Sequence, residues 1–130
     1  MKRIILLLLI ITISCNKTTK NSTVDFTTKF EKSEGLETTT YAETIAYFKQ
    51  LATEFSEISI QEVGETDSGY PLYLVIFNSD INFDFKKIKE SSKNVILINS
   101  AIHPGESDGV DASMLLLRNI VQDKNKVEEL

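Results

Sequence analysis

The sequence of 130 residues has few of the residues that cross-link small folds or bind metals: it contains one cysteine and one histidine. A single cysteine excludes a disulfide framework within one chain. A single histidine excludes a zinc site with several His or Cys ligands, unless further ligands come from elsewhere. There is no basic surplus either, because the formal net charge is -5 and the pI is about 4.9. Nucleic acid is therefore not expected as a partner, since binding it requires cations that neutralise phosphates.

The overall composition is that of a globular protein, with 42% hydrophobic and 25% charged residues. These proportions exclude collagen-like, low-complexity and fully disordered chains. The length alone fits one domain of ordinary size. The N-terminal part of the chain, however, need not belong to the folded unit.

The N-terminus has the pattern of an export signal. Lys2 and Arg3 precede an apolar run over residues 4–13, which is too short to span a membrane and has the length of a signal-peptide core. Cys15 follows directly and resembles the lipidated cysteine of a bacterial lipobox. We expect residues 1–14 to be a removed signal peptide and Cys15 to carry a lipid that anchors an exported protein in the cell envelope. An ordinary secretory signal with an incidental cysteine, or a buried core segment, are the alternatives.

Two different compositions follow the signal. Residues 15–39 are rich in Thr, Lys, Ser and Glu and show no useful periodicity, so they are predicted to form a tether that becomes ordered near its end. Residues 40–130 are predicted to form the folded part. A capping box at Thr40 and Glu43 indicates where its first helix begins. The helix has an apolar face formed by Tyr41, Ile45, Phe48, Ala52 and Phe55.

Three apolar stretches in the folded part predict strands. Residues 58–65 and 72–77 flank an Asp-Ser-Gly turn and predict an antiparallel hairpin. Residues 95–101 predict another buried strand, while residues 78–93 are polar with room for a short helix. Residues 109–122 predict a second amphipathic helix, capped by Ser107 or Asp108. Amphipathic helices packed on a buried sheet indicate the α/β class.

The candidate chemistry lies in the tetrapeptide His103-Pro104-Gly105-Glu106, between the last predicted strand and the helix that follows. Ligands of open α/β sheets bind at the carboxyl ends of strands. Imidazole and carboxylate both bind zinc, and the Pro-Gly pair favours a turn tight enough to bring the two side chains together. Zinc there would polarise a carbonyl and lower the pKa of a bound water. The spacing alone is also compatible with a surface loop whose histidine bonds locally.

The residues that flank His103 and Glu106 favour the zinc site over the surface loop. Residues 103–112, followed by the helical stretch 114–118, resemble the first zinc-ligand motif of the zinc metallocarboxypeptidase family. The resemblance covers about residues 38–122 and includes, in order, the Tyr41–Phe55 helix, the 58–63 strand, the Gly69-Tyr70-Pro71 turn and the 72–77 strand. It implies the N-terminal part of a mixed sheet flanked by helices, with zinc bound by His103 and Glu106. It also implies hydrolysis of C-terminal peptide bonds in peptides or cell-wall peptides.

The family's third zinc ligand, catalytic Glu and substrate-carboxylate binders lie further downstream, so no catalytic residue is expected within these 130 residues. We therefore interpret the chain as the N-terminal portion of a longer enzyme, inactive by itself. Asp108 or Asp111 could complete a metal site or cap the helix, and Arg118 is expected to be a solvated helix charge. The alternatives are a non-catalytic, lipid-anchored binding module on a degenerate peptidase scaffold, a related amidohydrolase of N-acyl amino acids, and an accidental H-x-x-E in an envelope protein.

Overall fold

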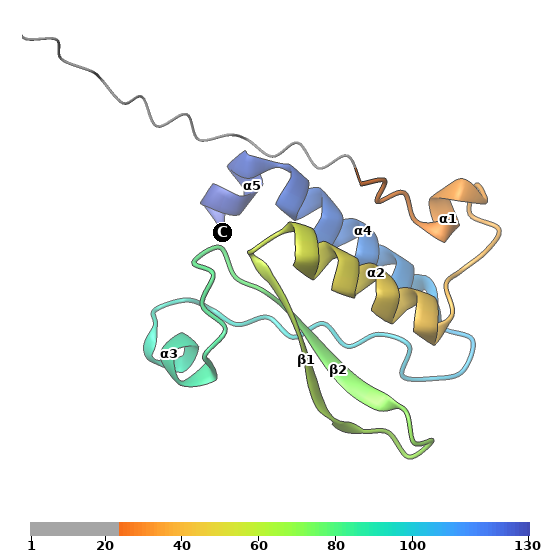
Figure 1. The fold of residues 1–130 in the computed structure, drawn as a ribbon, viewed down its shortest axis with the longest axis horizontal. Coiled ribbons are helices and arrows are strands. Elements are labelled where there is room, and N and C mark those ends of the chain that lie inside the picture. Colours follow the sequence, from red (N-terminus) through yellow and green to blue (C-terminus); the bar gives the residue numbers. More distant parts are fainter. Residues whose placement is uncertain (1–23) are drawn as a thin grey trace, which may run out of the picture.

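The computed structural model describes residues 24–130. The predicted signal peptide and Cys15 lie outside this range. The fold is mixed α/β, as predicted, with a two-stranded antiparallel sheet and flanking helices (Figure 1). No helix in the described range is long and apolar enough to cross a membrane. The elements are α1 (Lys29–Lys32), α2 (Tyr41–Glu54), β1 (Ile58–Glu65), β2 (Pro71–Phe77), α3 (Phe85–Glu90), α4 (Asp108–Gln122) and α5 (Lys124–Glu129).

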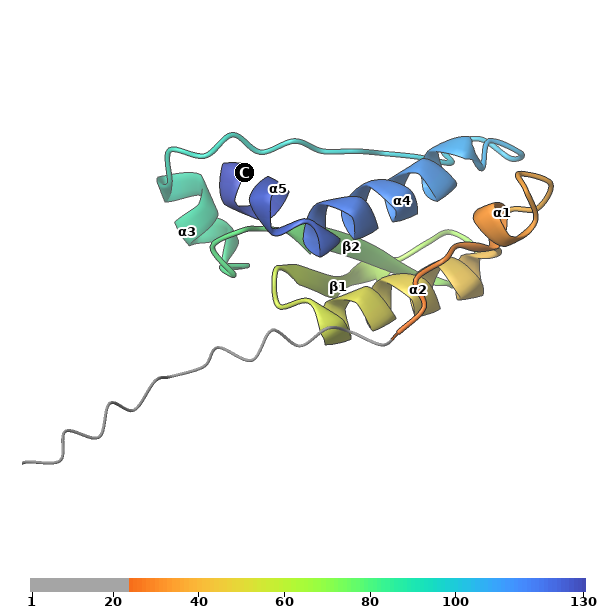
Figure 2. The ribbon, with the colours of Figure 1, turned by 90° about the horizontal axis from the view of Figure 1, so that it is seen from above.

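Helix α2 begins at the predicted capping box. The backbone N–H of Thr40 donates to Glu43 Oε2 over 2.7 Å, and the N–H of Glu43 donates to Thr40 Oγ1 over 3.3 Å. These two bonds satisfy donors that the first turn of a helix leaves without intrahelical partners. The helix lies beside α4 and packs against β1 (Figures 1 and 2).

The predicted hairpin is confirmed. Strands β1 and β2 pair antiparallel from Ile58 opposite Phe77 to Glu65 opposite Pro71, with an irregularity between Glu62 and Gly64. The turn places Gly69 at a φ of +74°, a conformation that costs glycine little. Pro71 pairs at the start of β2, a position where proline is tolerated.

The core lies where α2, α4 and β1 meet. Leu51 of α2 and Met114 of α4 are almost completely buried, and Ile58 joins them from β1. Ile58 and Met114 are apolar positions of the predicted strand and helix, whereas Leu51 lies outside the apolar face predicted for α2. The buried hydrophobic residues are Phe26, Phe48, Leu51, Ile58, Met114 and Val121.

Residues 24–39, called the N-terminal strap below, differ from the predicted tether. Phe26 lies in the core, where its ring contacts Tyr47 and Phe55 at centroid distances of 6.0 and 5.7 Å. Thr28 is 1% exposed and caps α1. An aromatic side chain with a site in the core thus helps to fix a polar segment whose sequence shows no period. The ordered structure thus begins upstream of the predicted boundary at residue 40.

The prediction of a buried strand over residues 95–101 is wrong for this structure. Residues 93–102, called the extended stretch below, lie between α3 and the His103–Glu106 turn and do not join the sheet (Figure 2). The side chains of its residues 95–98 are between 58% and 84% exposed. An apolar run indicates that its side chains tend to be buried. A strand also requires a neighbouring strand that pairs with its backbone N–H and C=O groups. Within residues 24–130 the only ladder is that of β1 with β2.

Candidate metal centre

His103, Pro104, Gly105 and Glu106 form a tight turn just before α4. The backbone N–H of Glu106 donates to the carbonyl of His103 over 3.4 Å. Gly105 has a φ of +86°, in the left-handed region that side chains with a Cβ rarely adopt. The Pro-Gly pair therefore folds the chain back, so that the residues before and after it face each other.

The turn brings the two predicted ligand side chains together. His103 Nδ1 lies 3.0 Å from Glu106 Oε2, and the two side chains are 67% and 60% exposed. Bonds of about 2.1 Å in a tetrahedral zinc site put neighbouring donor atoms about 3.4 Å apart. The 3.0 Å separation is that of a hydrogen bond between the two side chains, and a small outward movement of both would place them at two positions of such a site.

The described residues hold no third ligand beside this pair. No group of three or more His, Cys, Asp and Glu side chains in residues 24–130 is placed to hold a metal ion. Asp111, one candidate for completing the site, is 4% exposed, and its Oδ2 accepts a bond from Thr38 Oγ1 over 2.6 Å. Its Oδ1 has no hydrogen-bond partner among the described residues. Asp111 thus holds the N-terminal strap against α4, which is neither of the roles predicted for it.

The predicted side-chain cap of α4 is not formed. Ser107 is the N-cap residue, but its side chain makes no capping bond. Asp108 and Asp111 stand in the first turn instead, where a negative charge is favourable next to the positive end of the helix dipole. The start of α4 is therefore fixed by the turn before it and by the bond to Thr38.

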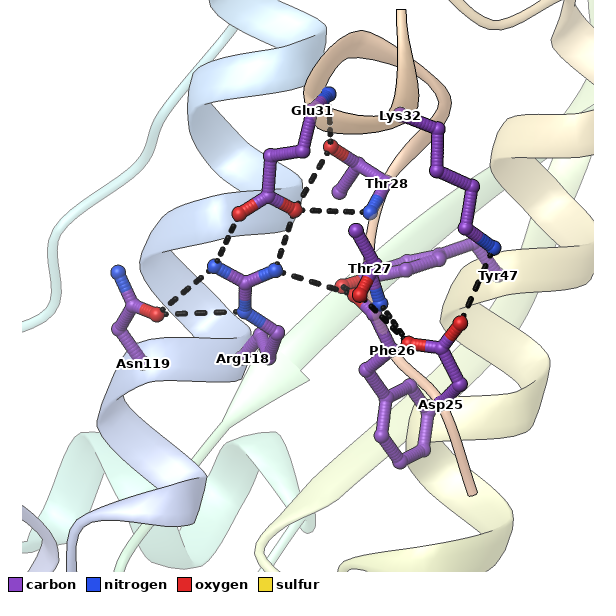
Figure 3. Close-up of polar contacts among 9 residues, drawn as sticks. All are labelled: Asp25, Phe26, Thr27, Thr28, Glu31, Lys32, Tyr47, Arg118 and Asn119. Atoms are coloured by element: carbon purple, nitrogen blue, oxygen red, sulfur yellow. Dashed lines mark hydrogen bonds and ion pairs between the residues drawn. The ribbon is translucent and has the colours of Figure 1, made fainter. Parts of the chain in front are cut away.

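Arg118 is not the solvated helix charge that the sequence predicted. Its guanidinium is 14% exposed and lies between α4 and the N-terminal strap (Figure 3). Nη2 donates to Glu31 Oε1 over 2.9 Å, and Nη1 donates to Glu31 Oε2 and, over 3.1 Å, to the carbonyl of Phe26. The fork of the guanidinium matches the carboxylate, which makes this the strongest polar contact of the strap.

The pKa values agree with this arrangement. Hydrogen bonding from Arg118, aided by the backbone N–H and hydroxyl of Thr28, lowers the pKa of Glu31 to about 2 against the opposing effect of its partial burial. The same bond raises the pKa of Arg118. Burial raises the pKa of the neighbouring Tyr47 to about 12, and its hydroxyl donates to the carbonyl of Phe26 over 3.0 Å.

The sequence contained a signal for part of this contact. Thr28 and Glu31 have the spacing of a capping box, and the structure forms both of its bonds. The same pattern correctly predicted α2, so it could have predicted α1 as well. The pairing of Glu31 with Arg118, 87 residues away, has no local signal.

A family model described as zinc carboxypeptidase matches residues 44–130, which is more than half of the chain. The match begins within α2 and includes the hairpin, the His103–Glu106 turn and α4. Neither the curated proteins nor the solved structures contain a match to this chain.

Proposed function

Because the chain belongs to the zinc carboxypeptidase family, we propose that the intact protein is a metallocarboxypeptidase that hydrolyses C-terminal peptide bonds of peptides or cell-wall peptides. The observation that carries the proposal is the 3.0 Å approach of His103 Nδ1 to Glu106 Oε2. Family membership by itself gives the class of reaction, whereas this approach supports the assignment of two particular residues.

In this proposal His103 and Glu106 hold the zinc ion. Zinc in such a site supplies Lewis-acid chemistry, which polarises a carbonyl and activates water at neutral pH. The protein's own contribution is the turn, in which Pro104 and Gly105 direct the two side chains toward each other before metal arrives. Both side chains are exposed, so metal and substrate can reach them without opening the core. The site needs further ligands and a base from residues other than this pair.

We also propose that the protein is exported and attached to the cell envelope by a lipid on Cys15. The support is the sequence pattern of a short apolar run followed at once by the only cysteine. A lipid anchor would keep the peptidase beside the envelope, where cell-wall peptides are found. Mass spectrometry of the N-terminal peptide, with Cys15→Ala as the control, tests this part separately.

The metal assignment is tested by zinc titration of the intact enzyme, which supplies the further ligands, and of its His103→Ala and Glu106→Gln variants. We expect stoichiometric zinc binding that weakens at least about 10-fold in either variant, because each removes one ligand. Glu128→Gln, an exposed carboxylate on α5, is the matched control and should bind as the parent does. Zinc binding that His103→Ala leaves unchanged would contradict the assignment and favour the non-catalytic scaffold.

The activity itself is tested on the intact enzyme with peptides that have a free C-terminal residue. We expect release of that residue, its loss on treatment with a chelator, and its return on addition of zinc. Release of an acyl group from N-acyl amino acids, with no action on peptides, would instead favour the related amidohydrolase.

A further inference from the structure

The two ends of the loop that contains His103 and Glu106 meet at Ser100 and Gly109. A Cβ built on Gly109 would lie 2.7 Å from Ser100 Oγ and 2.8 Å from Ser100 Cβ. A Cβ atom essentially never lies this close to a non-bonded atom, and Ser100 Cβ cannot move away without its backbone. The extended stretch is therefore seated directly on the backbone of the first turn of α4, at a point where only glycine leaves room.

The backbone beside this contact is also held in an unusual conformation. Ala101 has a φ of +56°, in the left-handed region that residues with a Cβ avoid. Such a residue persists where its surroundings fix it. The chain thus turns sharply directly after Ser100, and this turn directs the next residues toward the His103–Glu106 turn.

The Ser100–Gly109 contact lies at equal sequence distances from the two proposed zinc ligands. Ser100 stands three residues before His103, and Gly109 stands three residues after Glu106. The contact closes the loop of residues 100–109 at its base, while the His103 and Glu106 side chains lie exposed at its tip. The backbone of Gly109 is held in place within α4, because its carbonyl accepts a hydrogen bond from Ser113 Oγ over 2.6 Å.

We propose that Gly109 is a positioning residue for the metal pair: its missing side chain lets Ser100 dock on α4, which holds His103 and Glu106 at the separation that zinc requires. The inference rests on the proposed zinc site and extends it to a residue that binds no metal. An alanine at position 109 pushes Ser100 away, opens the base of the loop and separates the two ligands. Removal of the Ser100 side chain in the same molecule removes the obstacle.

The proposal is tested with Gly109→Ala, Ser100→Gly and the double variant. The first readout needs no metal: in the 130-residue chain His103 is the only histidine, so its ring protons give one assignable pair of NMR signals. We expect a nuclear Overhauser contact from His103 to the Glu106 side chain in the parent, its loss in Gly109→Ala and its return in the double variant. The second readout is the zinc affinity of the intact enzyme, expected to fall about 10-fold in Gly109→Ala and to recover in the double variant.

Rescue by the double variant separates positioning from a general effect on α4. Alanine has a higher helix propensity than glycine, so without the clash Gly109→Ala would stabilise the helix and leave the ligand pair intact. A Gly109→Ala chain that retains the His103–Glu106 contact would overturn the inference, as would a double variant that fails to regain it. If the 130-residue chain shows this contact but the intact enzyme binds no zinc, the proposed function is overturned and the inference on the loop still stands.

Discussion

The N-terminal strap and the extended stretch both flank helix α4 outside the sheet, yet they differ in how firmly their residues are held. The strap is mostly polar but is held by a buried phenylalanine, the Asp111–Thr38 bond and the forked contact of Glu31 with Arg118. The extended stretch is strongly apolar but leaves residues 95–98 mostly exposed. Composition therefore does not decide which segment is fixed; the availability of partners does.

The two segments also differ in what they contribute: the N-terminal strap to the stability of the fold, and the extended stretch to the position of His103 and Glu106. The strap contributes Phe26 to the core and contacts α4 at Arg118, well along the helix from the His103–Glu106 turn, as well as at Asp111 in its first turn. The extended stretch leads into the loop that carries His103 and Glu106 and touches α4 closely at Ser100 and Gly109. We therefore expect substitutions in the strap to affect unfolding, and substitutions at the Ser100–Gly109 contact to affect metal binding.

Among substitutions in these two segments, the largest effect on stability is expected from Phe26→Ala. Removal of a buried phenylalanine ring leaves a cavity beside Tyr47 and Phe55 and costs about 3 kcal/mol of unfolding free energy. Chemical denaturation followed by circular dichroism measures it. Phe85→Ala is the matched control, because Phe85 is 53% exposed at the start of α3 and its loss should cost less than about 1 kcal/mol. Equal effects of the two substitutions would show that the strap is not docked in solution.

A smaller and pH-dependent effect is expected from Glu31→Gln. Glutamine can keep the capping box at Thr28 but removes the charge that Arg118 binds. We expect a loss of about 1–2 kcal/mol at neutral pH, after allowance for solvent screening of a carboxylate that is one-third exposed. Glu37→Gln, which affects an exposed ion pair with Lys29, should change stability by less than about 0.5 kcal/mol.

The stabilisation that the Glu31 charge provides depends on pH. The pKa of Glu31 is about 2 in the folded chain and near its ordinary value of about 4.3 when unfolded. The contribution is thus fully present above pH 4.3 and is lost as the pH falls toward 2, because the unfolded state then binds the proton more readily. Parent and Glu31→Gln should converge in stability over that interval. A difference that stays constant down to pH 2 would contradict the role of the charge.

The sequence predicts those features that depend on neighbouring residues and misses those that depend on residues far apart in the chain. Helices α2 and α4 and the β1–β2 hairpin were predictable because their signals are local: a capping box, an apolar face and a turn with Gly69. Arg118 and Asp111 were misjudged because their partners, Glu31 and Thr38, lie far away in sequence. The approach of His103 to Glu106 was predictable because the turn between them is encoded by Pro104 and Gly105. The seating of Ser100 on Gly109 was not, since a glycine near a helix start has several possible reasons.

The smallest effect on stability is expected where the apolar content is highest. Leu97→Lys in the extended stretch should change the unfolding free energy by less than about 0.5 kcal/mol, because residue 97 is 77% exposed and a charge there is solvated. The same substitution should reduce self-association, since an exposed apolar segment with unpaired backbone groups can pair with a second chain. Thermal unfolding and sedimentation at increasing concentration measure the two quantities. Leu51→Lys, a substitution in the core, is the contrasting control and should unfold the chain. A loss of several kcal/mol in Leu97→Lys would mean that the extended stretch is covered in solution, which would remove the contrast with the N-terminal strap.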